Sequence, residues 1–221
     1  MDIDWDLVRS SLGPIATYAA LGTVPLALAS FAIGLMIALA VALMRLSRVR
    51  SVAAVGRAYV SVVRGTPLLV QLYIVFYGLG SVGIRIDPWP SAILAFSLNV
   101  GGYAAEVVRA AILSVPKGQW EAAHMIGMSR RQTLQRIILP QAARVSVPPL
   151  SNTFISLVKD TSLASTILVT ELFRRAQEIA AFSSEFMLIY TEAAVVYWVL
   201  CLALSAGQSR LERRLDRHVA V

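Results

Sequence analysis

Four charged residues lie in apolar stretches of the sequence where charge is costly: Glu106, Arg109, Lys159 and Asp160. A charged side chain inside a bilayer usually has a function or a charged partner. Each acid could bind a cationic group of a polar solute, or could be neutralised by a basic neighbour. Glu106 and Arg109 are three residues apart, a spacing at which side chains meet on a helix.

Asp160 is predicted to lie deep in the membrane. It follows Pro148 by twelve residues. A helix entering the membrane at Pro148 would place Asp160 roughly 18 Å in, past the middle of about 30 Å of hydrocarbon. Adjacent helical residues point in different directions, so a break after Val158 would help Lys159 and Asp160 to face one cavity.

Polar and small residues precede Glu106 on the same segment. Asn99 and Tyr103 can form hydrogen bonds with a solute. Gly101 and Gly102 leave room for backbone contact, but glycines in a membrane helix more often serve helix packing, which is the expectation for both.

The tripeptide Gly65-Thr66-Pro67 interrupts an earlier segment. The interruption either frees backbone carbonyls toward a cavity or only kinks a helix. The candidate solute-binding residues are therefore Glu106, Asp160, Asn99, Tyr103, Lys159 and Thr66.

Catalytic and metal chemistry are not indicated. Cys201 is the only cysteine, and His124 and His218 are the only histidines. A disulfide within the chain and a His/Cys metal cluster are therefore not expected. Cys201 is predicted within a span and both histidines outside the spans, so no Cys-His or Ser-His pair is expected. Lys117 and Lys159 do not form a phosphate-binding loop, so no ATPase site is expected here.

The composition indicates a membrane protein. Of 221 residues, 57% are hydrophobic and 15% charged, and the mean hydropathy is +0.68. Residues 10–44 contain no charge, a stretch long enough to cross a bilayer. The N-terminus is acidic, which argues against a cleaved signal peptide.

The predicted fold is an all-α membrane domain spanning residues 1–221, with about five transmembrane helices. Five apolar segments cover residues 15–44, 66–82, 89–115, 145–158 and 186–208. Pro25 is expected to kink the first. The fourth is short for a crossing, so it must continue through Lys159 and Asp160 or break there. No internal repeat is evident, which disfavours a secondary transporter.

Basic residues set the predicted orientation. Thirteen of the 20 lie after the first segment, between the third and fourth, or at the C-terminus. The positive-inside rule then puts the N-terminus outside and the C-terminus in the cytoplasm. The net charge of +7 is thereby explained without a nucleic-acid partner.

Residues 118–145 are too polar to cross a membrane, and their helix-capping pattern is not that of a flexible linker. Residues 120–126 favour a short helix ending at Gly127. Ser129 and Gln132 form a capping box for a second helix, which Pro140 ends or kinks. Such an elbow is typical of a docking surface, although a partnerless interfacial hairpin is an alternative.

The elbow resembles the signature of the permease subunits of binding-protein-dependent ABC importers: EAA, three residues, Gly, nine residues, Ile, one residue, Leu-Pro. The matching residues are Glu121, Ala122, Ala123, Gly127, Ile137, Leu139 and Pro140. The resemblance implies that this loop, about residues 116–144, couples the chain to an ATPase subunit.

Three further stretches are similar to the branch of that family that imports polar amino acids. They read VVRGTPLLVQLY from Val62, LNVGGYAAEVVRAAILSVPKGQWEAA from Leu98 and SLVKDTSLAS from Ser156. The resemblance implies five spans, an external N-terminus, and a substrate site lined by Glu106 and Asp160.

The resemblance also implies the partners. ATP and Mg²⁺ would be bound by ABC ATPase subunits, with no cofactor in this chain. A second permease subunit, identical or related, and a periplasmic or lipid-anchored solute-binding protein would complete the importer in the bacterial inner membrane, in contact with lipid. A secondary transporter or channel for a small polar solute is the alternative, and a scaffold without transport would leave the deep acids unexplained.

Overall fold

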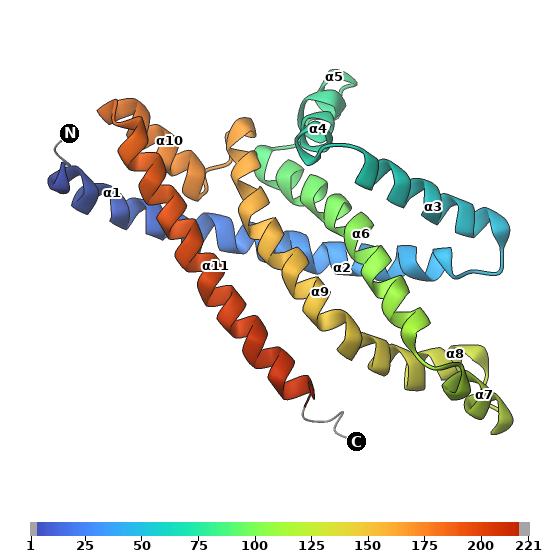
Figure 1. The fold of residues 1–221 in the computed structure, drawn as a ribbon. Coiled ribbons are helices and arrows are strands. Elements are labelled where there is room, and N and C mark those ends of the chain that lie inside the picture. Colours follow the sequence, from blue (N-terminus) through green and yellow to red (C-terminus); the bar gives the residue numbers. More distant parts are fainter. Residues whose placement is uncertain (1–3, 217–221) are drawn as a thin grey trace.

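Residues 4–216, the part described by the computed structural model, fold into helices without any strand (Figure 1). The all-α prediction is therefore confirmed for this range. Three helical stretches are long and apolar enough to cross a membrane: Trp5–Arg45, Pro88–Ser114 and Phe186–Arg214. The bent pair Arg50–Gly65 and Leu68–Ser81 would make a fourth, against about five predicted from the sequence.

The first long helix combines α1 (Trp5–Tyr18), a π-helical turn (Ala19–Thr23) and α2 (Val24–Arg45). Asp4 caps its start, because the Asp4 carboxylate accepts the backbone N–H groups of Asp6 and Leu7. Pro25 lies in the first turn of α2, where its missing N–H would leave an i−4 carbonyl without a donor. At Pro25, where a kink is expected, the structure has a π-turn just before the proline, and the helix continues to Arg45.

The second segment is bent. Helix α3 (Arg50–Gly65) and α4 (Leu68–Tyr73) meet at 107° across Thr66 and Pro67. A π-turn (Ile74–Gly78) and α5 (Leu79–Ser81) follow. Proline keeps the residue before it out of the α region, and Thr66 is extended, with ψ of 146°. The interruption predicted at this tripeptide is confirmed.

Helix α6 (Pro88–Ser114) packs against α2 and forms the centre of the core. A Cβ on Gly101 would lie 2.6 Å from Cγ2 of Ile37, and one on Gly102 would lie 2.5 Å from Cγ1 of Val63. Only glycine permits these close helix contacts, so the packing role predicted for both glycines is confirmed.

The elbow comprises α7 (Lys117–Met125), α8 (Arg130–Thr133) and a π-turn (Leu134–Ile138). Helix α9 (Leu139–Asp160) follows directly, so Pro140 neither ends the helix nor isolates the elbow. Helix α9 runs unbroken past Val158 to Asp160 and tightens into a 3₁₀ segment (Thr161–Ile167). Of the two alternatives for the fourth segment, continuation is the one observed.

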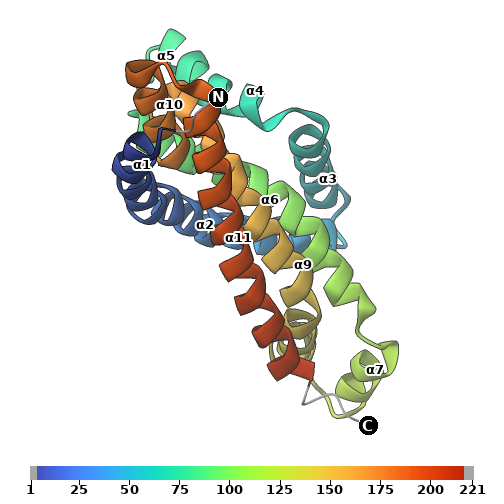
Figure 2. The same ribbon diagram turned by 60° about the vertical axis from the view of Figure 1, so that its left-hand side comes forward.

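Helices α10 (Leu172–Ser183) and α11 (Phe186–Asp216) complete the fold. Figure 2 shows α10 beside α1 and the start of α11 at one end, with α7 and the end of α11 at the other. Buried Glu171 joins three elements. Its carboxylate accepts hydrogen bonds from the Thr23 hydroxyl at 3.1 Å, the Tyr197 hydroxyl at 2.8 Å and the Arg174 backbone N–H at 2.7 Å.

Gly22 permits this junction to form. A Cβ at Gly22 would lie 2.8 Å from Cα of Glu171 and 2.9 Å from the carbonyl oxygen of Thr170. Because both are backbone atoms, we expect Gly22→Ala to destabilise the chain by about 1–3 kcal/mol, measured as a lower midpoint of thermal unfolding in detergent. Gly13→Ala in the same long helix, where a Cβ meets nothing within 4 Å, is the control. Equal midpoints for the two variants would contradict the close approach.

Candidate functional site

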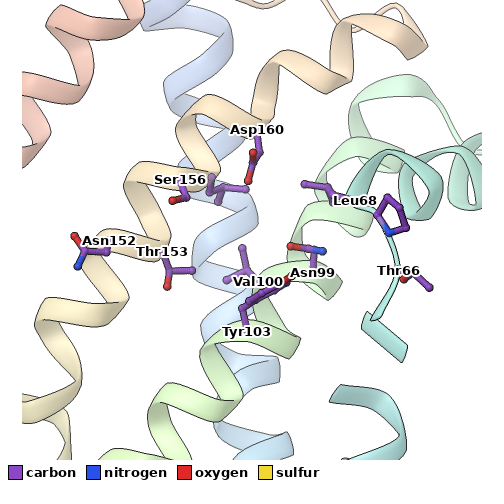
Figure 3. Close-up of a pocket in the computed structure, with 11 residues that line it drawn as sticks. Thr66, Leu68, Asn99, Val100, Tyr103, Asn152, Thr153, Ser156 and Asp160 are labelled. Carbon is purple, nitrogen blue, oxygen red and sulfur yellow. The ribbon is translucent and has the colours of Figure 1, made fainter. Parts of the chain in front are cut away.

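A cavity of about 430 Å³ lies where the bend before α4, the middle of α6 and the second half of α9 come together (Figure 3). We call it the Asp160 cavity. Its polar lining residues are Thr66, Asn99, Tyr103, Asn152, Thr153, Ser156 and Asp160. Four residues predicted to bind solute, Asp160, Asn99, Tyr103 and Thr66, are thus brought together from three separate segments.

Helical periodicity explains how one face of α9 lines this cavity. Asn152, Ser156 and Asp160 recur every four residues, so they form one row along the helix, visible in Figure 3. Asn99 and Tyr103 are spaced in the same way on α6. Thr153 and Asp160 of α9 point toward Asn99 and Tyr103 of α6 (Figure 3), whereas Asn152 points away from them and accepts a hydrogen bond from Gln208 of α11 at 3.1 Å.

Asp160 contributes the negative charge. Its side chain is partly buried and points toward the space above Asn99 (Figure 3). Among residues 4–214, Asp160 takes part in no ion pair. Lys159 is exposed and is not a lining residue, because on a continuous helix it points elsewhere. A carboxylate without a cationic partner in a polar cavity can bind a cationic ligand group.

Gln71 was not singled out from the sequence, although it controls the bend. Its amide nitrogen donates to the carbonyl oxygens of Val63 at 2.8 Å and Thr66 at 3.2 Å. Its amide oxygen accepts from the Asn99 side chain at 3.1 Å. Two of the carbonyls at the bend therefore accept hydrogen bonds from Gln71, which also orients Asn99 at the cavity wall.

Glu106 lies outside the Asp160 cavity. Its carboxylate forms ion pairs with Arg45, at the end of α2, and with Arg109, three residues ahead on α6. The neutralisation by Arg109 considered above is observed, and Arg45 adds a second partner from a distant part of the sequence. Glu106 lines an adjoining cavity of about 500 Å³, which also contacts Arg64 and Tyr103.

The elbow is built by two local motifs. Gly127 has φ of +78°, a region that favours glycine. The Gly127 N–H bonds to the His124 carbonyl and the Met128 N–H to the Ala123 carbonyl, which is the Schellman pattern that ends α7. Ser129 and Gln132 form the reciprocal capping box that starts α8. The predicted helix end and capping box are both confirmed.

Some residues of the EAA signature are packed inside the elbow, and others are exposed on its surface. Ala123 is 1% exposed, and Ile137 and Leu139 pack on the apolar cluster at the base of the elbow. Glu121 and Ala122 are exposed. So are two apolar residues that sequence reasoning did not single out, Met125 at 85% and Ile126 at 75% exposure.

The comparison with protein families decides the relationship. Residues 30–217 match the model of the family described as "Binding-protein-dependent transport system inner membrane component". The chain belongs to this family. It is accordingly a multi-pass inner-membrane component of a transport system, and the family resemblance noted in the sequence is confirmed.

Two relatives and one solved structure are similar to nearly the whole chain. The chain is 58% identical to the L-cystine transport system permease protein TcyB of Bacillus subtilis over 99% of this chain and 94% of that one. It is 36% identical to the glutamine transport system permease protein GlnP of Escherichia coli, over 97% and 99%. A crystal structure of an amino acid ABC transporter with histidines superposes with a TM-score of 0.89 at 32% identity, covering 97% of this chain and 100% of that chain.

Proposed function

We propose that this chain is the permease subunit of an ATP-driven importer for a polar amino acid, of the size and polarity of cystine or glutamine. The observation that carries the proposal is the carboxylate of Asp160, which has no ion-pair partner among residues 4–214 and lines a polar cavity between helices of a membrane domain. A charge in that setting is expensive unless a ligand compensates it. The relatives named above, which are amino-acid permeases, support the substrate class.

The cavity offers complementary groups for both ends of an amino acid. Asp160 would pair with the ammonium group. The amide of Asn99 and the hydroxyls of Thr153 and Ser156 would supply hydrogen bonds to the carboxylate. A volume of about 430 Å³ lies within the range of about 300–1,000 Å³ typical of small-molecule pockets. Glu106 would instead be paired with Arg45 and Arg109 beside the path.

We propose five crossings, in which α9 is added to the four stretches counted above, with the N-terminus outside. Helix α9 has 22 residues, enough for about 33 Å at a rise of 1.5 Å per residue. Its polar row, which lowers its mean hydropathy, would face the cavity, and the exposed apolar side chains of the other long helices would contact lipid. The elbow and the end of α11 lie at the same end of the molecule, which carries most of the basic residues and would face the cytoplasm.

The remaining components of the importer would be separate chains. ABC ATPase subunits would bind ATP and Mg²⁺ and dock on the elbow, at residues 116–144 of this single transmembrane domain. A second permease copy or a related chain would complete the pathway, and a periplasmic or lipid-anchored binding protein would deliver the substrate. The family description, which specifies a binding-protein-dependent system, favours this assembly over an ion-coupled carrier.

The test is reconstitution. Proteoliposomes containing this chain, its ATPase and its binding protein should accumulate radiolabelled L-cystine or L-glutamine only when ATP is supplied on the ATPase side. Accumulation by this chain alone on a sodium or proton gradient would instead support the secondary-transporter alternative.

The orientation can be tested by thiol labelling. Ser10 and Ser209 are exposed and lie near opposite ends of the chain. In a Cys201→Ser background, we expect Ser10→Cys to react with a membrane-impermeant maleimide in intact spheroplasts. We expect Ser209→Cys to react only after the membrane is opened, because its basic surroundings would be cytoplasmic. The reverse pattern, or equal labelling of both positions in intact spheroplasts, would contradict the proposed topology.

A further inference from the structure

The cavity that contains Glu106, which we call the Arg64 cavity, adjoins the Asp160 cavity. Tyr103 and Thr153 line both. The other residues of the Arg64 cavity lie nearer the elbow: on α6 it extends from Tyr103 to Ser114, and on α9 it ends at Val145. The two cavities are therefore consecutive, with the Arg64 cavity between the Asp160 cavity and the elbow.

The acidic residue of the Arg64 cavity has ion-pair partners, whereas the basic residue has none among residues 4–214. The carboxylate of Glu106 is shared by Arg45 and Arg109. Arg64, in the last turn of α3, takes part in no ion pair among residues 4–214. Its guanidinium carbon instead lies 5.5 Å from the centre of the Tyr103 ring. The cavity thus presents one positive charge without an anionic partner, next to the ring that separates it from the Asp160 cavity.

We infer that the Arg64 cavity is a second binding position for the transported amino acid, in which the Arg64 guanidinium binds the substrate carboxylate. This inference rests on the proposed function. A guanidinium binds a carboxylate through two parallel hydrogen bonds, which are stronger than a stacking contact with a phenol ring. The carboxylate can therefore replace Tyr103 as the partner of Arg64.

The positions of the charges give the two cavities different tasks. Asp160 attracts the ammonium group in the first cavity, and Arg64 attracts the carboxylate in the second. Tyr103 stands between them and is 43% exposed, so its ring has room to turn. An amino acid that leaves Asp160 then meets an opposite charge for its other end before it reaches the elbow side.

Uptake measurements test whether the Arg64 charge is required. In the complete reconstituted complex, we expect Arg64→Gln to lower uptake of radiolabelled L-cystine about tenfold or more, because a charge-assisted bond is lost. We expect Arg64→Lys to fall between Arg64→Gln and the unsubstituted chain, because an ammonium still attracts a carboxylate but cannot form the two parallel hydrogen bonds. Arg57→Gln is the matched control, because Arg57 is exposed two turns earlier on α3 and lines neither cavity. Unchanged uptake with Arg64→Gln would overturn the inference.

Binding measurements separate a binding role from a structural one. The permease–ATPase complex without binding protein is titrated with radiolabelled L-cystine in a scintillation proximity assay. We expect two saturable sites per permease chain. Arg64→Gln should remove one and Asp160→Asn the other. If Arg64→Gln lowers uptake but leaves both sites, and Tyr103→Leu has the same effect, Arg64 only holds the ring and the inference is wrong.

The two proposals fail in distinguishable ways. Normal uptake and binding in Asp160→Asn, with one site lost in Arg64→Gln, would overturn the role of Asp160 and support that of Arg64. One site lost in Asp160→Asn, with both retained in Arg64→Gln, would overturn only the second binding position. Copurification of the ATPase with each variant confirms assembly before either result is interpreted.

Discussion

Asp160→Asn is expected to lower amino-acid uptake by about tenfold to a hundredfold, the equivalent of one hydrogen bond to a charged group. The carboxylate of Asp160 has no ion-pair partner among residues 4–214, so the substrate ammonium would be its counter-charge. Asparagine keeps the size and loses the charge. The measurement is the initial rate of ATP-dependent L-cystine uptake in proteoliposomes.

The control for this experiment is another acid outside the cavity. Asp87 is exposed just before α6, and its side chain forms no capping bond. Asp87→Asn should transport normally, and both variants should retain the ATPase on purification. Wild-type uptake in Asp160→Asn would show that the cavity does not select substrate through its charge.

Met125→Asp combined with Ile126→Asp is expected to detach the ATPase. The two side chains are 85% and 75% exposed at the tip of the elbow. Exposed apolar residues on a structured turn are suited to a buried contact, and a carboxylate placed in such a contact is desolvated without compensation. We expect ATPase binding to weaken by at least about tenfold, the loss typical of an interface hot spot. Copurification and ATP-dependent uptake should fail together.

Val82→Asp provides the comparison for the elbow variant. Val82 is 71% exposed directly after α5, far from the elbow along the chain. It introduces one carboxylate on an exposed apolar site, against two in the elbow variant, and the ATPase should remain bound. Retention of the ATPase by the elbow variant would contradict the docking role, and loss in both variants would indicate a general folding defect.

Much of the fold could be predicted because its signals are local. The uncharged first segment, the interruption before Pro67 and the capping box at Ser129 each depend on a few neighbouring residues. The four-residue spacing from Asn152 to Asp160 can also be seen in the sequence, although only Asp160 of that row was predicted to bind solute. The sequence did not decide whether the fourth segment continues through Lys159 and Asp160 or breaks there. Polar residues at that point are typical of the end of a span, and only the structure shows that a cavity lies beside them.

The arrangement of the site depended on contacts that sequence spacing cannot reveal. Arg45 and Glu106 are 61 residues apart, and their pairing follows from the packing of α2 on α6. That pairing separates Glu106 from Asp160, although both had been predicted in one site. Gln71 shows the same limit, because its role depends on a bend that brings two carbonyls of the preceding turn and the side chain of Asn99 within reach of one amide.

The amide of Gln71 also affects whether the bend can bind cations. Selectivity filters for potassium are rings of backbone carbonyls that replace the water around the ion. A bend beside a membrane cavity would ordinarily expose such oxygens, but Gln71 holds those of Val63 and Thr66 at 2.8 and 3.2 Å. These two carbonyl oxygens are therefore engaged with an N–H donor and are not open to a dehydrated cation.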